Sequence, residues 1–346
     1  MSRFPRPDYR ALTRYAPDRR AAPVDLSDNT NLWGAHPAAR RALARLADDD
    51  LRRYPDVYGE TLRSAIGRRF GVDAACVVTG CGSDDLLDSV FRAAGPGGGC
   101  VAYVEPTFSM VETFARMNGM RPAPAARDEA LADPARLLDD QPDVIYVCRP
   151  NNPTGELQPA AWVDALLDAA GGDGPLVVLD EAYADFAGES LLARAAGSPR
   201  LVVVRTLSKA FGLAGLRVGF TVSTPDVAAE VEKSRGPYKV TRPSEAGAVA
   251  ALEAGTAWTE RVIAETRRNR ERLSEALARR GTPALPSAAN FVLVPVPDAA
   301  ELARILRERG VAVRPFPGLP EIGDAVRISV GPWPLLERLL EAWPWT

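Results

Sequence analysis

The sequence predicts an α/β protein with a largely parallel sheet, and two features of the chain support this prediction. Short, valine-rich apolar runs recur from about residue 75, and stretches with helical spacing of apolar residues separate them. Runs that are apolar throughout are typical of strands covered by helices on both faces, and the alternation with helices favours parallel pairing. The predicted strands are Cys76–Thr79, Cys100–Val104, Val144–Cys148, Leu176–Leu179, Leu201–Val204 and Val218–Val222.

A smaller α/β domain is predicted towards the C-terminal end. Gly236, Pro237 and Pro243 interrupt the pattern, and a long charged helix is expected at about 256–280. Strands near 290–294, 311–314 and 326–330 then surround a helix near 299–309. We therefore expect an N-terminal arm with part of the small domain at 1–45, a large domain at 46–238 and a small domain at 239–346.

Composition excludes several classes of function. The 346 residues are 46% hydrophobic and 25% charged, which is typical of a globular protein, and the net charge of −3 provides no broad basic field for nucleic acid or a membrane. No apolar segment resembles a signal peptide or a membrane span, so we expect a cytoplasmic protein. The cysteines, which we expect to be buried reduced thiols without metal-type spacing, are Cys76, Cys81, Cys100 and Cys148.

His36 is the only histidine in the chain. A single histidine excludes polyhistidine zinc sites, and we predict no metal site; a structural role for it would also exclude Ser-His-Asp hydrolysis. Because Pro37 follows it, we expect His36 to lie at the start of a helix in a structural role. Acid–base chemistry near neutral pH is then left to a lysine, tyrosine or carboxylate.

Two predicted strands end close to residues with complementary chemistry. Asp180 follows Leu176–Leu179, and Lys209 lies shortly after Leu201–Val204. Ligands of such sheets bind at the carboxyl ends of the strands. A lysine amine there can form a Schiff base with pyridoxal phosphate, while a carboxylate keeps the pyridine nitrogen protonated. The alternative is a surface lysine and a helix-capping aspartate.

The loop Thr79–Asp85 is a candidate phosphate site. Gly82 lets backbone N–H groups approach an anion at the start of a helix, where Ser83 and Asp84 lie. Ser208 and Arg217 could complete the cage with a hydroxyl and a guanidinium. The alternative is an ordinary helix start, because acids in a first turn commonly stabilise helices.

Two further segments follow predicted strands. In Pro150–Gly155, the side-chain amide of Asn152 is preset to donate a hydrogen bond to a ligand, although the segment could be only a turn. Phe108 could stack on a flat ring. Its alternative role is that of a core aromatic.

These segments together resemble the fold-type I aminotransferases, most closely the histidinol-phosphate aminotransferases. The resemblance runs from about Tyr15 to Gly331, and its most specific parts are Arg149–Gly155, Asp180–Tyr183 and Thr206–Arg217. It implies pyridoxal 5'-phosphate as the cofactor, with Lys209 as the Schiff-base lysine and proton shuttle. Asp180 would pair with the pyridinium nitrogen.

The resemblance also implies the remaining cofactor contacts. Tyr183 and Asn152 would bind the phenolic oxygen, and Phe108, where many relatives have tyrosine, would stack on the ring. Tyr54 would reach the phosphate of a neighbouring subunit, which requires a homodimer with its active sites at the interface. The phosphate would be held by Gly82, Ser83, Asp84, Ser208 and Arg217.

The substrate residues follow from the same resemblance. Arg327 matches an arginine that clamps a substrate carboxylate. Arg314 and Tyr15 match residues associated with the substrate phosphate, and Asn29 belongs to the same substrate-binding set. One guanidinium could accept the side-chain carboxylate of glutamate and a phosphate in alternate half-reactions.

The chain departs from its relatives at two places. Thr30 replaces an acid and Trp33 adds bulk in Asn29–Gly34, and Lys239 replaces a small polar residue, usually asparagine, in Pro237–Thr241. We expect both changes near the substrate mouth.

The expected reaction is ping-pong transamination between histidinol phosphate and 2-oxoglutarate. The departures leave open transamination of aromatic amino acids or of another amine, and a phospho-amino-acid decarboxylase is a third possibility. A non-catalytic binding protein on the same scaffold is the alternative from another class.

Overall fold

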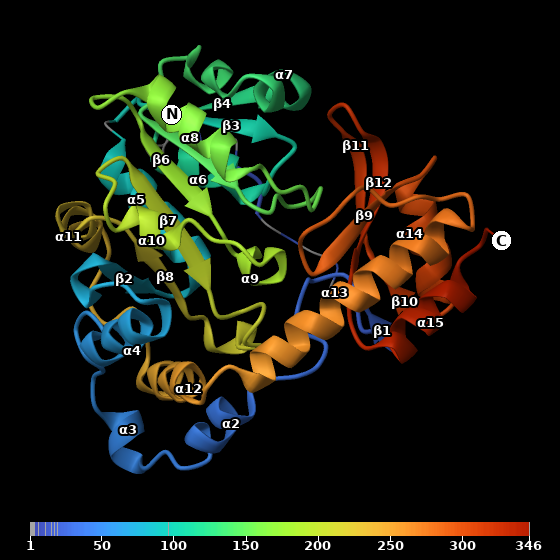
Figure 1. Cartoon of the computed structure of the whole chain (residues 1–346), viewed down its shortest axis with the longest axis horizontal. Coiled ribbons are helices and arrows are strands. Elements are labelled where there is room, and N and C mark those ends of the chain that lie inside the picture. Colours follow the sequence, from blue (N-terminus) through green and yellow to red (C-terminus); the bar gives the residue numbers. More distant parts are fainter. Residues whose placement is uncertain are drawn as a thin grey trace.

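This computed structural model of the chain describes residues 4–5, 7–10, 12–14, 16, 18, 20–95 and 97–345. Two bodies lie side by side (Figure 1). The larger is built on a seven-stranded sheet and the smaller on a three-stranded sheet. The long helix α13 (Ala257–Ala278) runs from the larger body to the smaller. The domain boundaries predicted at 45/46 and 238/239 stay a prediction.

The large sheet has the order β2-β8-β7-β6-β5-β3-β4. All strands are parallel except β8, which runs antiparallel to β2 and to β7. The predicted fold class is confirmed, and each of the six predicted runs forms a strand. The strands are β2 (Val77–Gly80), β3 (Cys100–Glu105), β4 (Arg121–Ala126), β5 (Val144–Cys148), β6 (Leu176–Asp180), β7 (Leu201–Thr206) and β8 (Gly219–Val222).

Strand β4 was missed by the sequence prediction. It contains Pro122 and Pro124, which cannot donate backbone hydrogen bonds. The strand lies at the edge of the sheet and pairs only with β3, so its other side needs no donors. Proline is tolerated at such an edge, which explains why a proline-rich strand is stable here.

Helices cover both faces of the large sheet and bury alternate strand residues. Val178 and Val202 face the core under α5, whereas Val177 and Val203 face the opposite core under α8. One face is covered by α5 (Gly82–Ala94), α6 (Met110–Met117) and α11 (Pro225–Ser234). The other is covered by α4 (Glu60–Phe70), α8 (Ala160–Ala170), α9 (Ala184–Ala187), α10 (Leu192–Ala195) and α12 (Arg242–Glu253).

Shorter helices complete the larger body and the N-terminal arm. Helix α2 packs against α12, and α1 contacts α6. These helices are α1 (Pro7–Arg10), α2 (Pro37–Leu43), α3 (Asp48–Arg52), α7 (Arg127–Ala132), η1 (Ala74–Cys76), η2 (Pro134–Leu138) and η3 (Ala214–Leu216).

The smaller body has a separate apolar core, formed by its two sheets and by α13, α14 and α15. The antiparallel sheet has the order β11-β12-β9, and β1 pairs in parallel with β10. Its elements are β1 (Val24–Asp25), β9 (Phe291–Pro295), β10 (Val311–Ala312), β11 (Arg314–Leu319), β12 (Gly323–Ser329), α14 (Ala299–Glu308) and α15 (Trp333–Ala342).

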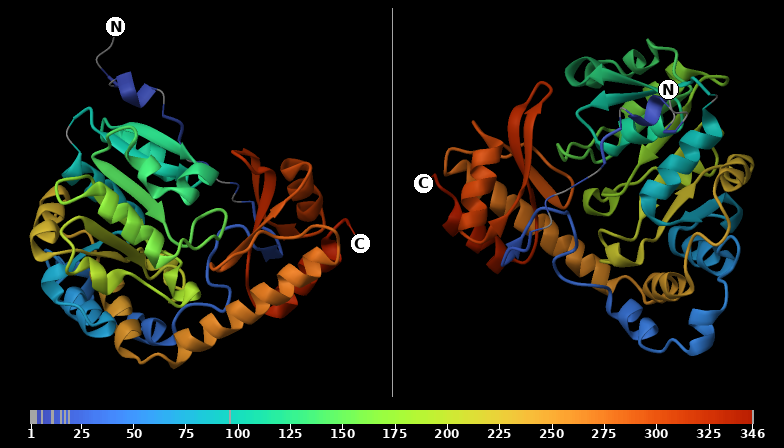
Figure 2. Two further views of the ribbon diagram at one scale, coloured as in Figure 1. Left: turned by 45° about the horizontal axis from the view of Figure 1, so that its top comes forward. Right: turned by 180° about the vertical axis from the view of Figure 1, so that it is seen from behind.

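The N-terminal arm connects the two bodies. Figure 2 shows it passing from α1, beside the larger body, to β1 in the smaller one and back to α2. The loop 26–36 therefore lies at the junction. His36 caps α2, where its Nδ1 accepts the N–H of Ala38 at 3.2 Å, and it is buried against Trp258. Its predicted structural role at a helix start is confirmed.

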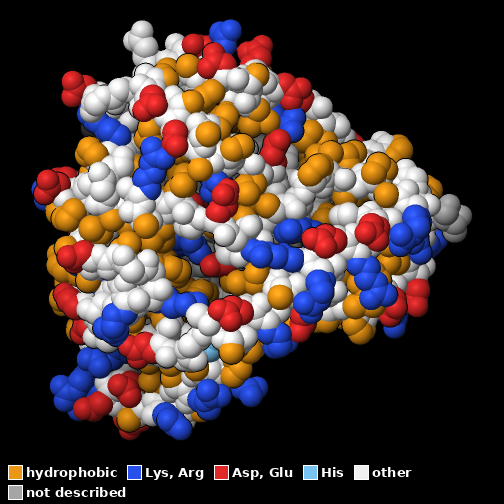
Figure 3. Space-filling view, viewed as in Figure 1, with side chains coloured by type: hydrophobic (Ala, Val, Ile, Leu, Met, Phe, Trp, Pro, Cys, Tyr) orange, Lys and Arg blue, Asp and Glu red, His pale blue; other side chains and the backbone are white. Residues whose placement is uncertain are grey.

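The surface carries charges of both signs. Figure 3 shows arginines and acids intermingled on the face that includes α13 and α14. Within the described part of the chain, none of the helices combines the length and the apolar character needed to cross a membrane. The four cysteines are free, as predicted, but Cys81 is exposed, which corrects the expectation that all four are buried. It lies at the surface because it is the N-cap residue of α5.

Candidate active site

A cavity of about 650 Å³ lies at the carboxyl ends of β5, β6 and β7, facing the smaller body. Its walls come from both bodies and from the N-terminal loop. Most of the predicted site residues line it. The lining residues are Asp28, Asn29, Thr30, Ser83, Asp84, Phe108, Met110, Phe114, Cys148, Asn152, Asp180, Ala182, Tyr183, Thr206, Ser208, Lys209, Ala214, Arg217 and Arg327.

Lys209 and Asp180 share this cavity, as the strand-end argument predicted. Asp180 is the last residue of β6, and Lys209 follows the end of the neighbouring strand β7. Burial lowers the pKa of Lys209 to about 8, and the charge of Arg327 acts in the same direction. Burial raises the pKa of Asp180 to about 6. At neutral pH the carboxylate is therefore ionised, and about a tenth of the lysine is the free amine.

Tyr146 holds the Asp180 carboxylate in place, and the sequence analysis did not identify it. Its hydroxyl donates to Oδ2 of Asp180 at 2.8 Å, while the N–H of Ala182 donates to Oδ1 at 3.0 Å. Tyr146 is fully buried on β5, directly beside β6. One feature of the sequence could have identified it: Tyr146 is a polar aromatic residue within the otherwise apolar strand β5.

Polar contacts cross from the smaller body to the cavity at Arg327 on β12. Its Nη1 donates to Oδ1 of Asn152 at 2.5 Å, and its Nη2 donates to the carbonyl of Ser27 at 3.0 Å. The amide of Asn29 donates to the hydroxyl of Tyr183 at 3.2 Å. The side chains predicted to bind the cofactor's oxygen and the substrate carboxylate therefore line the same cavity.

The loop carrying Asn152 is shaped by its neighbour Asn151. The side-chain amide of Asn151 donates to the carbonyl of Pro106 at 2.9 Å and to the hydroxyl of Thr154 at 3.0 Å. The backbone carbonyl of Asn151 accepts the N–H of Gly155 at 2.7 Å, where φ is +81°. This buried side chain fixes the turn and leaves Asn152 facing the cavity.

The N-terminal loop is bonded to both bodies. Asn29 has a positive φ of 54°, and its N–H donates to the hydroxyl of Ser329 at 2.8 Å. Asn31 donates from its amide to the backbone carbonyls of Lys209 and Ala210 at 3.1 and 3.0 Å. Asn31, which the sequence analysis did not assign to the site, therefore helps to hold the lysine segment.

The anion-binding end lies where α5 begins. The side chain of the N-cap residue Cys81 forms no capping hydrogen bond, and a Cβ on Gly219 would lie 2.6 Å from the backbone nitrogen of Ser83. A Cβ on Gly82, where φ is +84°, would lie 2.5 Å from Nη2 of Arg217. These glycines bring backbone N–H groups and a guanidinium together, which suits a phosphate. Ser208 adds a hydroxyl that accepts from Thr206 at 2.9 Å.

Gly82, Tyr54 and Arg314 are not among the described residues that line the cavity, although Gly82 opens the helix α5 beside it. Tyr54 is 77% exposed and stacks on Tyr238, with ring centroids 4.8 Å apart. Arg314 pairs with Arg327 across the β11–β12 ladder, but it lines a neighbouring cavity of about 320 Å³. Tyr15 lies outside the described residues. The roles predicted for Tyr54, Arg314 and Tyr15 stay predictions.

The departures from the family pattern fall in different places. Thr30 lines the cavity, as expected. The indole of Trp33 donates to Glu265 on α13 at 2.5 Å, and Lys239 binds Asp85 on α5 at 2.7 Å. Neither Trp33 nor Lys239 is among the described residues that line the cavity, and the expectation that they lie near the substrate mouth stays a prediction.

Comparison with known proteins decides the family. The model of the family described as aminotransferase class I and II matches residues 22–342. The chain belongs to this family. It is 36% identical over 352 residues to the histidinol-phosphate aminotransferase of Pseudomonas putida (strain W619), with 99% of each chain covered. The predicted family and aminotransferase activity are therefore confirmed.

Solved structures with the same architecture include two of interest for substrate chemistry. The histidinol-phosphate aminotransferase of Sinorhizobium meliloti, in complex with pyridoxal-5'-phosphate, matches with a TM-score of 0.86 and 28% identity over 99% of this chain and 97% of that one. The L-threonine-O-3-phosphate decarboxylase of Porphyromonas gingivalis matches with a TM-score of 0.82 and 25% identity over 92% and 98%. The predicted fold type is confirmed.

Proposed function

We propose that this aminotransferase uses pyridoxal 5'-phosphate to move an amino group from histidinol phosphate to 2-oxoglutarate in a ping-pong cycle. The observation that carries the proposal is that half-buried Lys209 and buried Asp180 line one cavity, with a glycine-lined helix start beside them. The full-length similarity to histidinol-phosphate aminotransferases supports the choice of substrate.

The residues present fit this cofactor. Asp180 is only 4% exposed and faces the cavity, so a protonated ring nitrogen would compensate a charge that burial otherwise disfavours. The glycine-lined turn before α5 suits the phosphate. Tyr183 and Asn152 would hold the ring oxygen, and Phe108 would cover the ring face. When bound, the cofactor supplies a conjugated ring that withdraws electrons from the substrate carbon.

Lys209 performs the proton transfer in this proposal. Burial keeps part of its amine unprotonated near neutral pH, so Nζ can take a proton from the substrate carbon and later return it. The centroid of the Tyr183 ring lies 5.6 Å from Nζ of Lys209. Asn31 fixes the lysine backbone through the carbonyl of Lys209. These contacts keep the Lys209 amine facing the cavity.

Arg327 binds the carboxylate of 2-oxoglutarate or glutamate in this proposal. Its guanidinium is buried and already oriented by Asn152 and Ser27. A planar guanidinium suits a carboxylate through two parallel hydrogen bonds. Arg314, on the adjacent strand, is proposed to bind the phosphate of the amine substrate, together with Tyr15.

We also propose a cytoplasmic homodimer with its active sites at the interface. Several large apolar side chains near α3 and the segment before α12 are exposed, a pattern typical of interaction surfaces. These are Leu51, Tyr54, Val57, Tyr58 and Tyr238. Tyr54 would reach the phosphate in the partner's cavity.

An absorbance experiment tests the function. The protein purified with pyridoxal phosphate is expected to be yellow, to bleach with histidinol phosphate and to regain its colour with 2-oxoglutarate. Phenylalanine serves as the control amine and is expected to react at least about 100-fold more slowly, because it lacks the phosphate. Equal rates for both amines would favour an aromatic aminotransferase, and a spectrum indifferent to every amine would contradict the proposal.

A phospho-amino-acid decarboxylase is the second candidate. The structural similarity to the L-threonine-O-3-phosphate decarboxylase favours it, because that enzyme has the same fold at 25% identity. Measurement of carbon dioxide released from threonine phosphate separates the two. Release at the rate of transamination would favour the decarboxylase, and the absence of release would remove it.

A further inference from the structure

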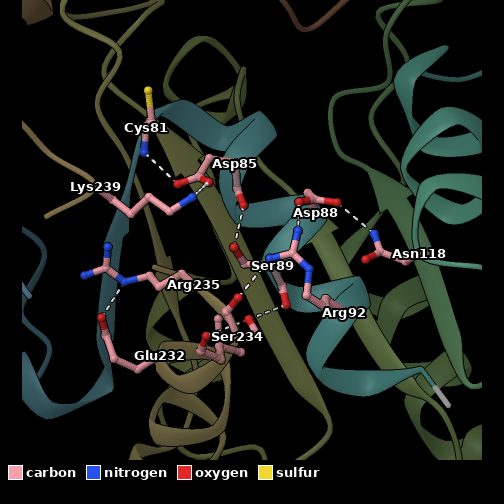
Figure 4. A network of polar contacts seen from close by, with 11 residues as sticks. Cys81, Asp85, Asp88, Ser89, Arg92, Asn118, Glu232, Ser234, Arg235 and Lys239 are labelled. Carbon is pink, nitrogen blue, oxygen red and sulfur yellow. Dashed lines mark hydrogen bonds and ion pairs between the residues drawn. The ribbon is translucent and has the colours of Figure 1, made fainter. Parts of the chain in front are cut away.

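The ammonium group of Lys239 lies at the start of α5, beside the proposed phosphate site. It comes from the connection between α11 and α12, and Nζ donates to Oδ1 of Asp85 at 2.7 Å. The side chains of Lys239 and Asp85 are 30% and 15% exposed, so the pair is partly shielded from solvent. Figure 4 shows this pair next to Cys81, at one end of a polar network along α5.

The second oxygen of Asp85 closes the turn that begins the helix. Oδ2 accepts the N–H of Cys81 at 2.9 Å. A Cβ on Gly80 would lie 2.9 Å from this oxygen, so a glycine leaves room for the contact. The same turn carries Ser83 and Asp84 to the cavity. The Asp85 carboxylate therefore shapes the backbone that is proposed to bind the phosphate.

The segment 234–239, which carries Lys239, also contacts α5 at Ser234. The hydroxyl of Ser234 donates to the carbonyl of Ser89 at 2.6 Å, and Nη1 of Arg92 donates to the carbonyl of Ser234 at 2.8 Å (Figure 4). Tyr238 donates its N–H to the carbonyl of Val57 at 3.1 Å. The two contacts of Ser234 hold the start of the segment against α5, and that of Tyr238 holds it against the loop before α4.

The charge of Lys239 affects how well the start of α5 can bind an anion. The first turn of α5 carries two carboxylates, and a bound phosphate would add a further negative charge. Nη2 of Arg217 lies 3.2 Å from Asp84, and Lys239 compensates Asp85. Without Lys239, a partly buried carboxylate would stay uncompensated one turn from the phosphate and would repel it.

We propose that Lys239 is a positioning residue that neutralises Asp85 and thereby strengthens binding of the cofactor phosphate at the start of α5. The inference rests on the proposed binding of pyridoxal phosphate. It gives a role to a residue that departs from the family pattern and lies outside the cavity lining.

The test measures the dissociation constant of pyridoxal phosphate for the apoenzyme by absorbance titration. Lys239→Gln is expected to weaken binding about five- to tenfold at low salt, and less at high salt, because the effect is electrostatic. The matched control is Lys233→Gln, which removes the same charge from an exposed pair with Glu230 on α11. Its dissociation constant is expected to stay within about twofold of the wild-type value.

Two further variants separate charge from folding. Asp85→Asn keeps an oxygen acceptor for Cys81 and is expected to bind pyridoxal phosphate at least as tightly as the wild type. The double variant Asp85→Asn/Lys239→Gln restores charge balance and is expected to recover wild-type binding within about twofold. Weaker binding by Asp85→Asn, or a double variant no better than Lys239→Gln, would overturn the inference.

The outcomes also distinguish this inference from the proposed function. A wild-type protein that fails to bind pyridoxal phosphate would overturn both. Tight wild-type binding with an unchanged dissociation constant for Lys239→Gln would overturn only the role of Lys239.

Discussion

The two halves of the cavity are built in different ways. The half that contains Asp180 and Lys209 lies at the ends of neighbouring strands of one sheet, each hydrogen-bonded to the next. The half that contains Asn29, Thr30 and Arg327 combines an N-terminal loop with a strand of the smaller body. One half therefore depends on a single sheet, and the other depends on how two bodies and a loop meet.

This difference shows which half of the cavity holds its residues in fixed positions and which half can vary among relatives. The hydrogen bonds between neighbouring strands fix the positions of residues at the strand ends, which suits a cofactor bound in one place. The loop and the smaller body are joined to the site by single side-chain contacts, such as Asn29 to Tyr183 and Arg327 to Asn152. Such contacts can be exchanged more readily, which suits a substrate pocket that differs among relatives.

The largest expected effect is in the strand-end half. Lys209→Ala should lower turnover by about 10³-fold or more, because no other lysine lies in the cavity lining. Steady-state kinetics with histidinol phosphate measures this effect. Lys233→Ala is the matched control and should retain wild-type turnover, whereas an active Lys209→Ala variant would contradict the assignment.

The next largest effect concerns the carboxylate. Asp180→Asn keeps an oxygen that can accept the N–H of Ala182, and its amide N–H can donate to the Tyr146 hydroxyl, but the change removes the charge that would face a protonated ring nitrogen. We expect cofactor binding to persist and turnover to fall about 10²- to 10³-fold. Parallel titration and kinetics measure both quantities, and unaltered turnover would show that the charge is dispensable.

A change in the other half should alter substrate affinity rather than cofactor binding. Arg327→Lys removes the planar guanidinium and should raise KM for 2-oxoglutarate about 10- to 100-fold. The dissociation constant of pyridoxal phosphate is expected to stay within about threefold. Similar losses in both constants would mean that the two halves are not separable.

The pKa of Lys209 predicts a pH dependence. Because burial lowers it to about 8, and only the free amine attacks the cofactor aldehyde, covalent attachment should slow about tenfold for each pH unit below 8. Above pH 8 the lysine is already unprotonated, so the rate should level off. Stopped-flow absorbance measures the midpoint, and a rate that keeps rising to pH 10 would mean an ordinary lysine.

The smallest effect is expected at the loop. Trp33→Phe removes the indole donor to Glu265 and should destabilise the protein by about 1 kcal/mol. KM for histidinol phosphate should change by no more than about threefold, because Trp33 is not among the described residues that line the cavity. Thermal unfolding and kinetics measure these changes. A larger change in KM would place Trp33 at the substrate mouth.

Sequence reasoning predicted the strand-end half well because order along a parallel sheet fixes which residues meet. Asp180 and Lys209 could be paired from two apolar runs alone. Tyr146 was missed because an aromatic residue inside a buried strand resembles ordinary core. Its function depends on its neighbour across the ladder, which the sequence does not display.

The substrate half was harder to predict because its contacts join distant parts of the chain. Asn29 lies 154 residues from Tyr183, and Arg327 lies 175 residues from Asn152. No local pattern signals either partner. The position of Arg314 likewise depends on how β11 faces the neighbouring cavity.

The central claim is that Lys209 is the residue that carries the cofactor. Lys209, Lys233 and Lys239 are the only lysines in the chain, so reduction with borohydride after addition of pyridoxal phosphate, followed by peptide mass mapping, has three possible sites of attachment. We predict that the cofactor is found on Lys209 alone. Its attachment to Lys233 or Lys239, or its absence from all three, would contradict the claim.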